Sequence, residues 1–415
     1  MNVVHISTSI SPSSANTQLQ RALQRKGIHS LILTLKCSTA ETNVQEVKRK
    51  LPHKVKALLF NRWFRMALRR YKTADRMPFS ASRTGINLSR LNTIKNADII
   101  HLHWICDFLS PKMIRNLLST GKPVVWTCHD SWPFTGGCHV RYGCSRYRQG
   151  CGECPLLHST TAKDITYRIL KTKEKYLSGQ KISFIAPSNW MKVHIEKSRV
   201  FGPCLCKVIP NTINTVTFRE LNDLQIQDTL AYVKDKEKLH ILFGATDVDI
   251  PYKGFRYLSE MLEILHARHE ISQNIVLHVV GAGGYRNSIP KDYEHICWGY
   301  IREPEKMAAL YNLADIFIYP SIDDNLPNMV MESLACATPV VAFRTGGIPD
   351  MVVHMENGYL AKYMDTQDLL KGLLWVAEHN AENRLGKNGH MKIIQEFSEE
   401  IVAQKHIQLY RELLH

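Results

Sequence analysis

The chain has 415 residues, of which 44% are apolar, and it carries a formal net charge of +15. This length predicts two domains, and the apolar content without low-complexity tracts excludes a disordered chain. No run of about 18 apolar residues occurs, and the first residues read as a strand rather than a secretion signal, so we expect a cytoplasmic protein. Eleven cysteines in such a protein favour free thiols or metal ligands over disulfides.

The chain begins as a strand–helix–strand unit. Residues 3–7 predict a buried strand, 17–25 a helix and 29–35 a second strand, an arrangement typical of a parallel sheet. Further strands of this half are predicted at 98–103, 122–128, 183–187 and 207–210, and a helix is predicted over 163–181.

A strongly basic segment spans residues 48–72, with ten basic residues and no acidic one. Beyond Pro52 its apolar residues recur at near-helical spacing, and Trp63 is among them. A basic amphipathic helix with aromatic residues is typical of a peripheral membrane contact. A helix packed on the core with a solvated basic face is the equal alternative. Nucleic acid is not expected as a partner, because no base-reading motif accompanies the charge.

A histidine follows one predicted strand directly. His129 comes after strand 122–128, at the edge where doubly wound sheets bind ligands. Asp130 is placed to orient its imidazole or to meet a second substrate. His101 and His103 are interpreted as core or cleft-wall residues. His129 is therefore a candidate active-site histidine of the first half, and a structural histidine at a strand end is the alternative.

Four cysteines follow within residues 131–157. Cys138, Cys144, Cys151 and Cys154 have the spacing C-x5-C-x6-C-x2-C, with glycines that allow tight turns. The final pair forms a knuckle suited to tetrahedral thiolate coordination, so the hypothesis is a structural zinc. Reduced buried thiols and a redox pair are the alternatives. Four thiolates leave no open position for water, so a metal here would not be catalytic.

The second half restarts the pattern after a predicted hinge at 211–235. Strands are predicted at 239–244, 275–280, 295–300 and 316–319, and a helix opens at Gly254. Lys253 stands where the loop meets this helix, a place from which a lysine reaches a phosphate. A solvated surface lysine is the alternative.

Residues 319–350 form the most informative stretch, a predicted strand, polar loop, helix and strand. Asp324 lies in the loop and Glu332 lies inside the helix, eight residues later. The helix N-terminus between them offers unpaired N–H groups to an anion. Carboxylates beside such an anion site suit a ligand that carries both phosphates and hydroxyls. The alternative is an ordinary structural unit with two solvated acids.

This stretch resembles the signature of the retaining family 4 glycosyltransferases, which have the GT-B fold. Their pattern is an acid, seven residues, a Glu and then Pro-Val-Val, matched here by Asp324, Glu332 and 339–341. Residues 129–157 resemble the HDxWPFTGGC insertion of a subgroup that acts in bacterial polysaccharide assembly. The resemblance covers nearly the whole chain.

The resemblance implies a nucleotide-sugar donor and assigns its contacts. Glu332 would hold the ribose, Asp324 would contact the donor sugar, and His129 would lie near that sugar and the reacting phosphate. Lys253 and Gly254 would bind the diphosphate. Donor contacts are also implied for Tyr300 and Ile301 at the nucleobase, and for the loop and helix residues Asn325, Leu326, Pro327, Asn328, Met329 and Val330.

The chain departs from the family pattern at three places. Ser13 and Ser14 replace a Gly-Gly pair near the donor phosphates, Ala245 replaces a phosphate-clamping Arg, and Asp324 replaces a Glu. Arg256 and Arg344 are candidates to supply the missing charge.

The expected fold is α/β, with two Rossmann-like parallel-sheet domains facing a cleft. The expected parts are an acceptor domain at 1–215 with the cysteine insertion at 131–157, a donor domain at 216–396, and a helix at 397–415 that crosses back onto the first domain.

The expected function is retaining, metal-independent transfer of a sugar from a UDP- or GDP-sugar to a lipid-linked or oligosaccharide acceptor of a bacterial surface polysaccharide. No cofactor is expected for catalysis, and segment 48–72 is expected to contact the cytoplasmic face of the inner membrane. A nucleotide-sugar epimerase and a non-catalytic nucleotide-sugar-binding protein are the alternatives.

Overall fold

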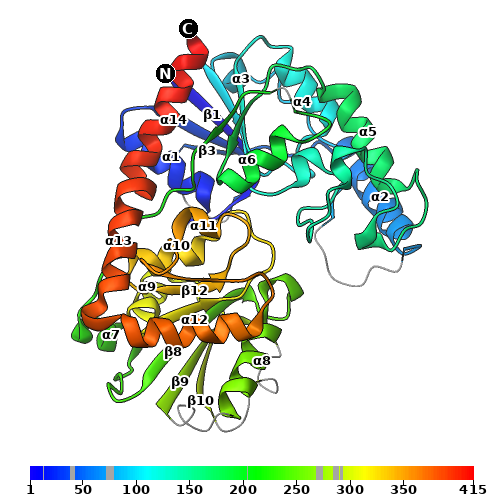
Figure 1. The fold of residues 1–415 in the computed structure, drawn as a ribbon. Helices are drawn as coiled ribbons and strands as arrows, with labels where there is room; N and C mark the ends of the chain where they lie inside the picture. The colour runs from blue at the N-terminus through cyan, green and yellow to red at the C-terminus, as the bar shows by residue number, and fades with distance from the viewer. Residues whose placement is uncertain are drawn as a thin grey trace. The chain divides into compact units, whose positions relative to one another are not determined.

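The computed structural model describes residues 1–12, 14–37, 43–71, 79–202, 204–267, 274–283, 289 and 293–415 (Figure 1). Contacts divide the chain into two compact units. Unit 1 comprises Met1–Thr212 and Val402–His415, and unit 2 comprises Ile213–Ile401. Each unit contains one parallel sheet.

The sheet of unit 1 has seven strands in the order β3-β2-β1-β4-β5-β6-β7. The strands are β1 (Asn2–Ile10), β2 (His29–Cys37), β3 (Val44–Glu46), β4 (Ile99–Leu102), β5 (Val124–Thr127), β6 (Ser183–Ala186) and β7 (Cys206–Val208). The strand order reverses between β1 and β4, which pair in register with His5 opposite His101. Such a reversal opens a crevice beyond the carboxyl ends of the two strands.

Helices cover both faces of this sheet. They are α1 (Ala15–Arg25), α3 (Asn92–Lys95), α4 (Pro111–Leu118), α5 (Ile165–Leu177), α6 (Asn189–Glu196) and α14 (Glu399–Leu414). Helix α2 (Leu51–Leu68) instead packs through Phe64 against Ala81 and against Ile169 of α5. Alternate strand residues point to opposite faces. Val3 and Ile99 pack against α1 and α14, whereas Val4 and Ile100 belong to the cluster that includes α4, α5 and α6.

Helix α14 is part of the core of unit 1. Val402, Ile407 and Tyr410 are buried among strand residues of β1 and β4. The Tyr410 hydroxyl is 2.7 Å from Nδ1 of the buried His101. The predicted helix over 397–415 is broken at Ser398, whose extended backbone separates α14 from α13 (Arg384–Phe397).

The sheet of unit 2 has six strands in the order β10-β9-β8-β11-β12-β13. They are β8 (Leu239–Asp247), β9 (Ile275–Ala282), β10 (Glu294–Gly299), β11 (Ile316–Tyr319), β12 (Val340–Phe343) and β13 (Gly358–Ala361). The strand order reverses between β8 and β11, so a second ligand-binding edge lies at their carboxyl ends. The helices are α7 (Asp223–Leu230), α8 (Phe255–His266), α9 (Pro304–Leu313), α10 (Asn328–Ala335), α11 (Ile348–Met351), α12 (Thr366–His379) and α13.

The fold class predicted from the sequence is confirmed: both sheets are parallel and doubly wound. The helix predicted over 163–181 is shorter, because Asp164 caps it by accepting from the N–H groups of Thr166 and Tyr167. Across the described residues, we find no helix with the length and apolar character needed to cross a bilayer.

Replacing Tyr410 by Phe should lower the free energy of unfolding by about 1–3 kcal/mol, because it leaves Nδ1 of His101 buried without its partner. Denaturant unfolding measures this change. Tyr363→Phe is the control, since its side chain is 49% exposed, and it should change stability by less than about 0.5 kcal/mol. Equal effects of the two substitutions would contradict a structural role for the Tyr410 hydroxyl.

Candidate functional site

Unit 2 brings Lys253 and Asp324 together at its ligand-binding edge. Lys253 follows β8 and Asp324 follows β11. Nζ of Lys253 lies 2.7 Å from Oδ2 of Asp324 and 3.0 Å from the Tyr319 hydroxyl. That hydroxyl donates to the same carboxylate oxygen at 2.7 Å. The lysine expected at phosphate and the acid expected at sugar thus form one ion pair, joined by a tyrosine that the sequence reading did not assign to the site.

This ion pair is largely shielded from water. The Lys253 and Asp324 side chains are 17% and 18% exposed. Burial alone would lower the pKa of Lys253, but the carboxylate of Asp324 outweighs it and holds that pKa well above its usual value. Burial and Asp324 likewise raise the pKa of Tyr319. Lys253 therefore remains positively charged, and Tyr319 remains a hydrogen-bond donor.

Two glycines let the loops approach closely around the pair. Gly254 has φ +79°, and a Cβ there would lie 1.9 Å from the carbonyl oxygen of Pro320. Gly346 has φ +57°, and a Cβ there would lie 1.7 Å from the carbonyl oxygen of Asp324. A side chain at either position would push apart the segments that hold Lys253 and Asp324.

Glu332 lies in the second turn of α10. Its carboxylate accepts a 3.0 Å hydrogen bond from the Tyr311 hydroxyl. Burial raises the pKa of Glu332 from 4.5 to about 7, although the Tyr311 bond acts in the opposite direction. Between these two pH values the folded chain holds a proton that the unfolded chain releases, so this group lowers stability as the pH rises through that window. Hydroxyl donors from a ligand would favour the ionised form.

The other predicted donor residues differ in what their side chains can do. Tyr300 follows β10 and is 56% exposed, whereas Leu326 and Val330 are buried in the core of unit 2. Those two can therefore meet a ligand only through backbone atoms. Ile301, Asn325, Asn328 and Met329 are half-buried, and Pro327 is buried at the N-cap of α10.

Ala245 stands where the family pattern has a phosphate-clamping Arg, and it supplies no charge there. Ala245 is buried in the core, so its Cβ does not face a ligand. The guanidinium of Arg256 lies 4.5 Å from the ring centroid of Tyr257, on the surface of α8. Arg344 is exposed just after β12. Whether either meets a diphosphate stays a prediction.

In unit 1, the half-buried His129 beyond β5 adjoins a row of buried histidines, which are His5 in β1, His101 in β4 and His103 just after β4. His129 Nε2 is 3.0 Å from His103 Nδ1, and His103 Nε2 is 2.9 Å from His5 Nδ1. His101 stacks beside His103, with ring centroids 4.2 Å apart. His101 and His103, interpreted as core or cleft-wall residues, are buried, and His103 also contacts the candidate His129 directly.

These rings are neutral at physiological pH. Burial lowers the pKa of His129 to about 4 and that of His5 to about 3, and it holds those of His101 and His103 well below the usual value. Each neutral ring carries one N–H. Donation therefore runs in one direction along His5, His103 and His129, so the tautomer of His103 fixes which nitrogen of His129 is protonated.

Three histidines of this cluster lie close enough together to be considered as metal ligands. Among the described residues, His5, His101 and His103 are the three whose ligand atoms lie within 4.8 Å of one another. Both nitrogens of His101 are engaged, with the hydroxyls of Tyr410 and Thr127, and both nitrogens of His103 are engaged with other histidines. The geometry favours a hydrogen-bonded cluster over a metal site.

Asp130 ties the cysteine insertion to the end of β5. Its Oδ2 is 2.6 Å from Nδ1 of His139 and accepts from the Trp104 indole, while Oδ1 accepts from the backbone N–H of Trp132. Burial alone would raise the pKa of Asp130, but His139 and these donors outweigh it and lower that pKa. Buried Lys173 donates to the carbonyl oxygens of Trp132 and Thr135. The insertion is therefore anchored to unit 1 by polar contacts.

The insertion brings its four cysteines to one small cavity. Cys138, Cys144, Cys151 and Cys154 all line a space of about 20 Å³, and none forms a disulfide. That volume accommodates about one atom or water molecule. The donor set and the size of the space fit a zinc ion, although the sulfurs are not drawn into a tight group as in a loaded site.

The first loop of unit 1 begins α1. Ser14 is the N-cap residue of α1. Its hydroxyl donates to the carbonyl oxygen of Ser11 and lies 2.8 Å from the Thr17 hydroxyl. Its side chain is thus engaged within the turn. Ser13 lies outside the described residues.

Two family models match the chain, one in each half. The model described as Glycosyltransferase Family 4 matches residues 15–217, and the model described as Glycosyl transferases group 1 matches residues 238–379. The chain is 25% identical over 261 residues to the putative colanic acid biosynthesis glycosyl transferase WcaC of Escherichia coli K12, covering 59% of this chain and 58% of that relative. It is 24% identical over 271 residues to the capsular polysaccharide biosynthesis glycosyltransferase CapM of Staphylococcus aureus, covering 62% of this chain and 69% of that relative.

Solved structures share the fold along the whole chain. Sucrose-phosphate synthase from Thermosynechococcus elongatus aligns with a TM-score of 0.66 at 17% identity, covering 100% of this chain and 99% of that one. The HepE protein of Anabaena, solved with UDP-glucose, aligns with a TM-score of 0.63 at 14% identity, covering 99% and 100%. The two parallel sheets and these neighbours establish the GT-B fold.

Replacing Asp324 by Asn should lower the free energy of unfolding by about 3 kcal/mol, because it leaves the Lys253 cation shielded from water without its counter-ion. Lys253→Met should cost a similar amount for the converse reason. The double variant should cost less than the sum of the two, as denaturant unfolding of all four proteins will measure. Strict additivity would contradict a direct interaction between the two side chains.

Proposed function

We propose that the chain transfers a sugar from a nucleotide-sugar donor to a lipid-linked or oligosaccharide acceptor with retention of configuration. It belongs to the glycosyltransferases, because it joins a family 4 domain to a group 1 glycosyltransferase domain on the GT-B fold. The observation that carries this proposal is the Lys253–Asp324 pair at the strand reversal of unit 2, with Glu332 in the helix that follows. Cation, helix N-terminus and acids together suit a diphosphate attached to sugars.

Each group has a role in the proposed reaction. Glu332 accepts hydrogen bonds from the ribose hydroxyls, and its raised pKa means that donor binding near neutral pH releases a proton. Lys253 exchanges part of its contact with Asp324 for the diphosphate, and Asp324 then meets the donor sugar. Because Asp324 is one methylene shorter than Glu, the sugar lies closer or a water fills the gap.

Charge on the departing diphosphate is stabilised by groups already in place. Lys253 and the N-terminus of α10 supply positive charge without reorganisation, so the proposal needs no catalytic metal. The acceptor attacks on the face that the diphosphate leaves, and a phosphate oxygen takes the acceptor proton. In unit 1 we propose a catalytic role for His129, which His103 holds through a hydrogen bond.

The relatives support the choice of substrates. WcaC and CapM are named for colanic acid and capsular polysaccharide biosynthesis, and HepE is solved with UDP-glucose. We infer a UDP- or GDP-sugar as donor and a bacterial surface polysaccharide as product. We also infer that the protein acts at the cytoplasmic face of the inner membrane, through the basic segment that contains α2.

Replacing Glu332 by Ala should abolish donor binding, because two hydroxyl contacts to one carboxylate are lost. Calorimetry with UDP-, GDP-, ADP- and dTDP-sugars measures this, and mass spectrometry of reactions with lipid-linked acceptors identifies the product. Glu305→Ala, which removes an exposed acid of α9, is the control and should bind normally. Near-normal turnover by the Glu332 variant would contradict the assignment of Glu332 to donor binding. Product from donor alone would favour an epimerase, and binding without turnover would favour a non-catalytic protein.

We further propose that Cys138, Cys144, Cys151 and Cys154 hold a structural zinc ion. All four line one small space, and the insertion is held by hydrogen bonds from Arg141 to the carbonyl oxygen of Cys144 and from Lys173 to that of Thr135. A closed set of four thiolates would stiffen the loop without taking part in the chemistry.

The purified protein should contain about one zinc per chain, measured by elemental mass spectrometry. Cys151→Ser should lose the metal and lower the melting temperature, whereas Cys297→Ser in unit 2 should change neither. Chelation of the wild type should reproduce the effect of Cys151→Ser. Metal-free protein of unchanged stability would rule out the zinc.

A further inference from the structure

Helix α2 exposes a continuous apolar stripe. Its members recur at helical spacing along one side, and their exposed fractions run from 47% to 73%. They are Leu51, Val55, Leu58, Leu59, Trp63 and Met66. The opposite side holds the helix to unit 1 through Phe64, which packs with Ala81 and Ile169. Within the described structure, no other helix leaves so much large apolar surface uncovered.

The stripe is bordered by cations alone. The segment from Lys48 to Tyr71 contains no acidic residue, and Lys54, Arg62 and Arg65 are exposed along α2. An apolar face between cations complements a bilayer surface that bears negative charge. A protein partner would need both an apolar groove and an acidic rim to match the same surface.

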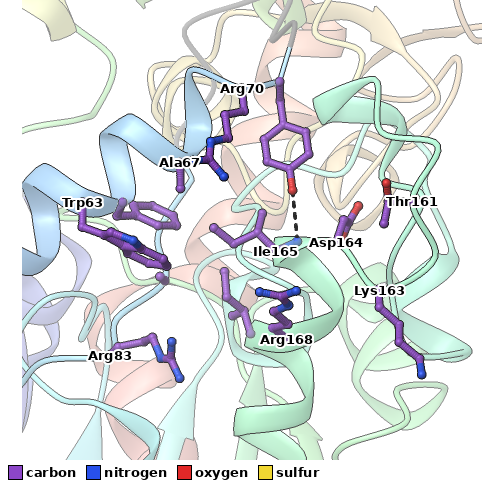
Figure 2. A pocket seen from close by; sticks show the side chains of 13 residues that line it. Trp63, Ala67, Arg70, Arg83, Thr161, Lys163, Asp164, Ile165 and Arg168 are labelled. Atoms are coloured by element: carbon purple, nitrogen blue, oxygen red, sulfur yellow. Dashed lines mark hydrogen bonds between the residues drawn. The ribbon is translucent and has the colours of Figure 1, made fainter.

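A pocket of about 320 Å³ opens beside this stripe, between α2 and the start of α5. Trp63 belongs to both the stripe and the pocket wall. Figure 2 shows Trp63, Ala67 and Arg70 on the α2 side and Ile165 and Arg168 on the α5 side. Its volume lies in the range of small-ligand sites, about 300–1,000 Å³.

The pocket combines an apolar floor with a cationic border. Arg70, Arg83, Lys163 and Arg168 line it, and all four are exposed. Figure 2 shows the amine of Lys163 directed away from the centre, which leaves the three arginines as the nearer cations. Among the described residues, no acid lies within salt-bridge distance of these arginines.

The acid that lines the pocket is already committed. Asp164 is buried, and its two carboxylate oxygens accept from the N–H groups of Cys154, Thr166 and Tyr167 and from the Thr166 hydroxyl. It therefore caps α5 and does not neutralise the arginines. The uncompensated charge of the pocket favours an anionic ligand, and arginine forks suit the oxygens of a phosphate.

We propose that this pocket binds the phosphate headgroup of an anionic phospholipid while the apolar stripe of α2 lies in the bilayer surface. Trp63 marks the boundary between headgroup and acyl region, a position that indole rings favour. The inference deepens the proposed membrane association and requires neither donor nor acceptor.

The test is flotation of the full chain with vesicles of phosphatidylcholine, alone or with phosphatidylglycerol. The wild type should favour the anionic vesicles, and R70Q/R168Q should weaken that binding by at least about tenfold. R90Q/R115Q removes the same charge from exposed arginines elsewhere in unit 1 and should weaken binding much less. Leu58→Ser/Leu59→Ser should reduce binding to both kinds of vesicle.

Equal losses of vesicle binding in R70Q/R168Q and R90Q/R115Q would overturn the proposed binding pocket, because only the overall charge of the protein would then matter. Equal binding to both vesicle types would overturn the proposal that the pocket binds an anionic headgroup. If R70Q/R168Q fails to fold, as circular dichroism would show, R83Q/R168Q repeats the comparison. Since the readout is vesicle binding, failure of glycosyl transfer leaves the result interpretable.

Discussion

Unit 2 depends on one ion pair at the edge of its sheet. Lys253 and Asp324 come from loops that follow two neighbouring strands, and their contact fixes both loops in front of α10. Tyr319 supplies the third bond, and two glycines give the backbone room. In unit 1 the corresponding edge is built from neutral rings instead, with His103 between His5 and His129. At both edges most shielded polar groups bond to one another, and the exception among the described residues is Nε2 of His5, which is buried without a partner.

The sequence predicted the sheets well for a simple reason. Strands buried on both faces are continuous apolar runs, so β4, β5 and β11 fall within two residues of their predicted bounds. The short, polar strand β3 carries no such run and was missed. Helix α13 was also missed before residue 397, because Gly386 and Gly389 weigh against a helix unless close packing requires them.

The candidate residues could be placed at the sheet edges from the sequence, but their partners could not. Strand order decides that His103 meets His129 and that Lys253 meets Asp324, and neither pair is close in sequence. Asp130 illustrates the same limit, since its carboxylate binds His139 and Trp104 and so fixes the cysteine insertion. Residue type and strand position indicate where chemistry is available, whereas the tertiary contacts decide which groups are held, charged or neutral.

The place of α14 has a consequence for how the chain folds during synthesis. Val3, Leu23 and Ile99 share a core with Val402, Ile407 and Tyr410, so the part of this sheet face that α1 does not cover stays exposed until those residues leave the ribosome. At about 5–20 residues per second, roughly 20–80 seconds pass between translation of the two segments. Unit 2 has no such delay and can fold first. We therefore expect the nascent first half to rely on chaperones that shield apolar surface, and to be the part most sensitive to premature termination.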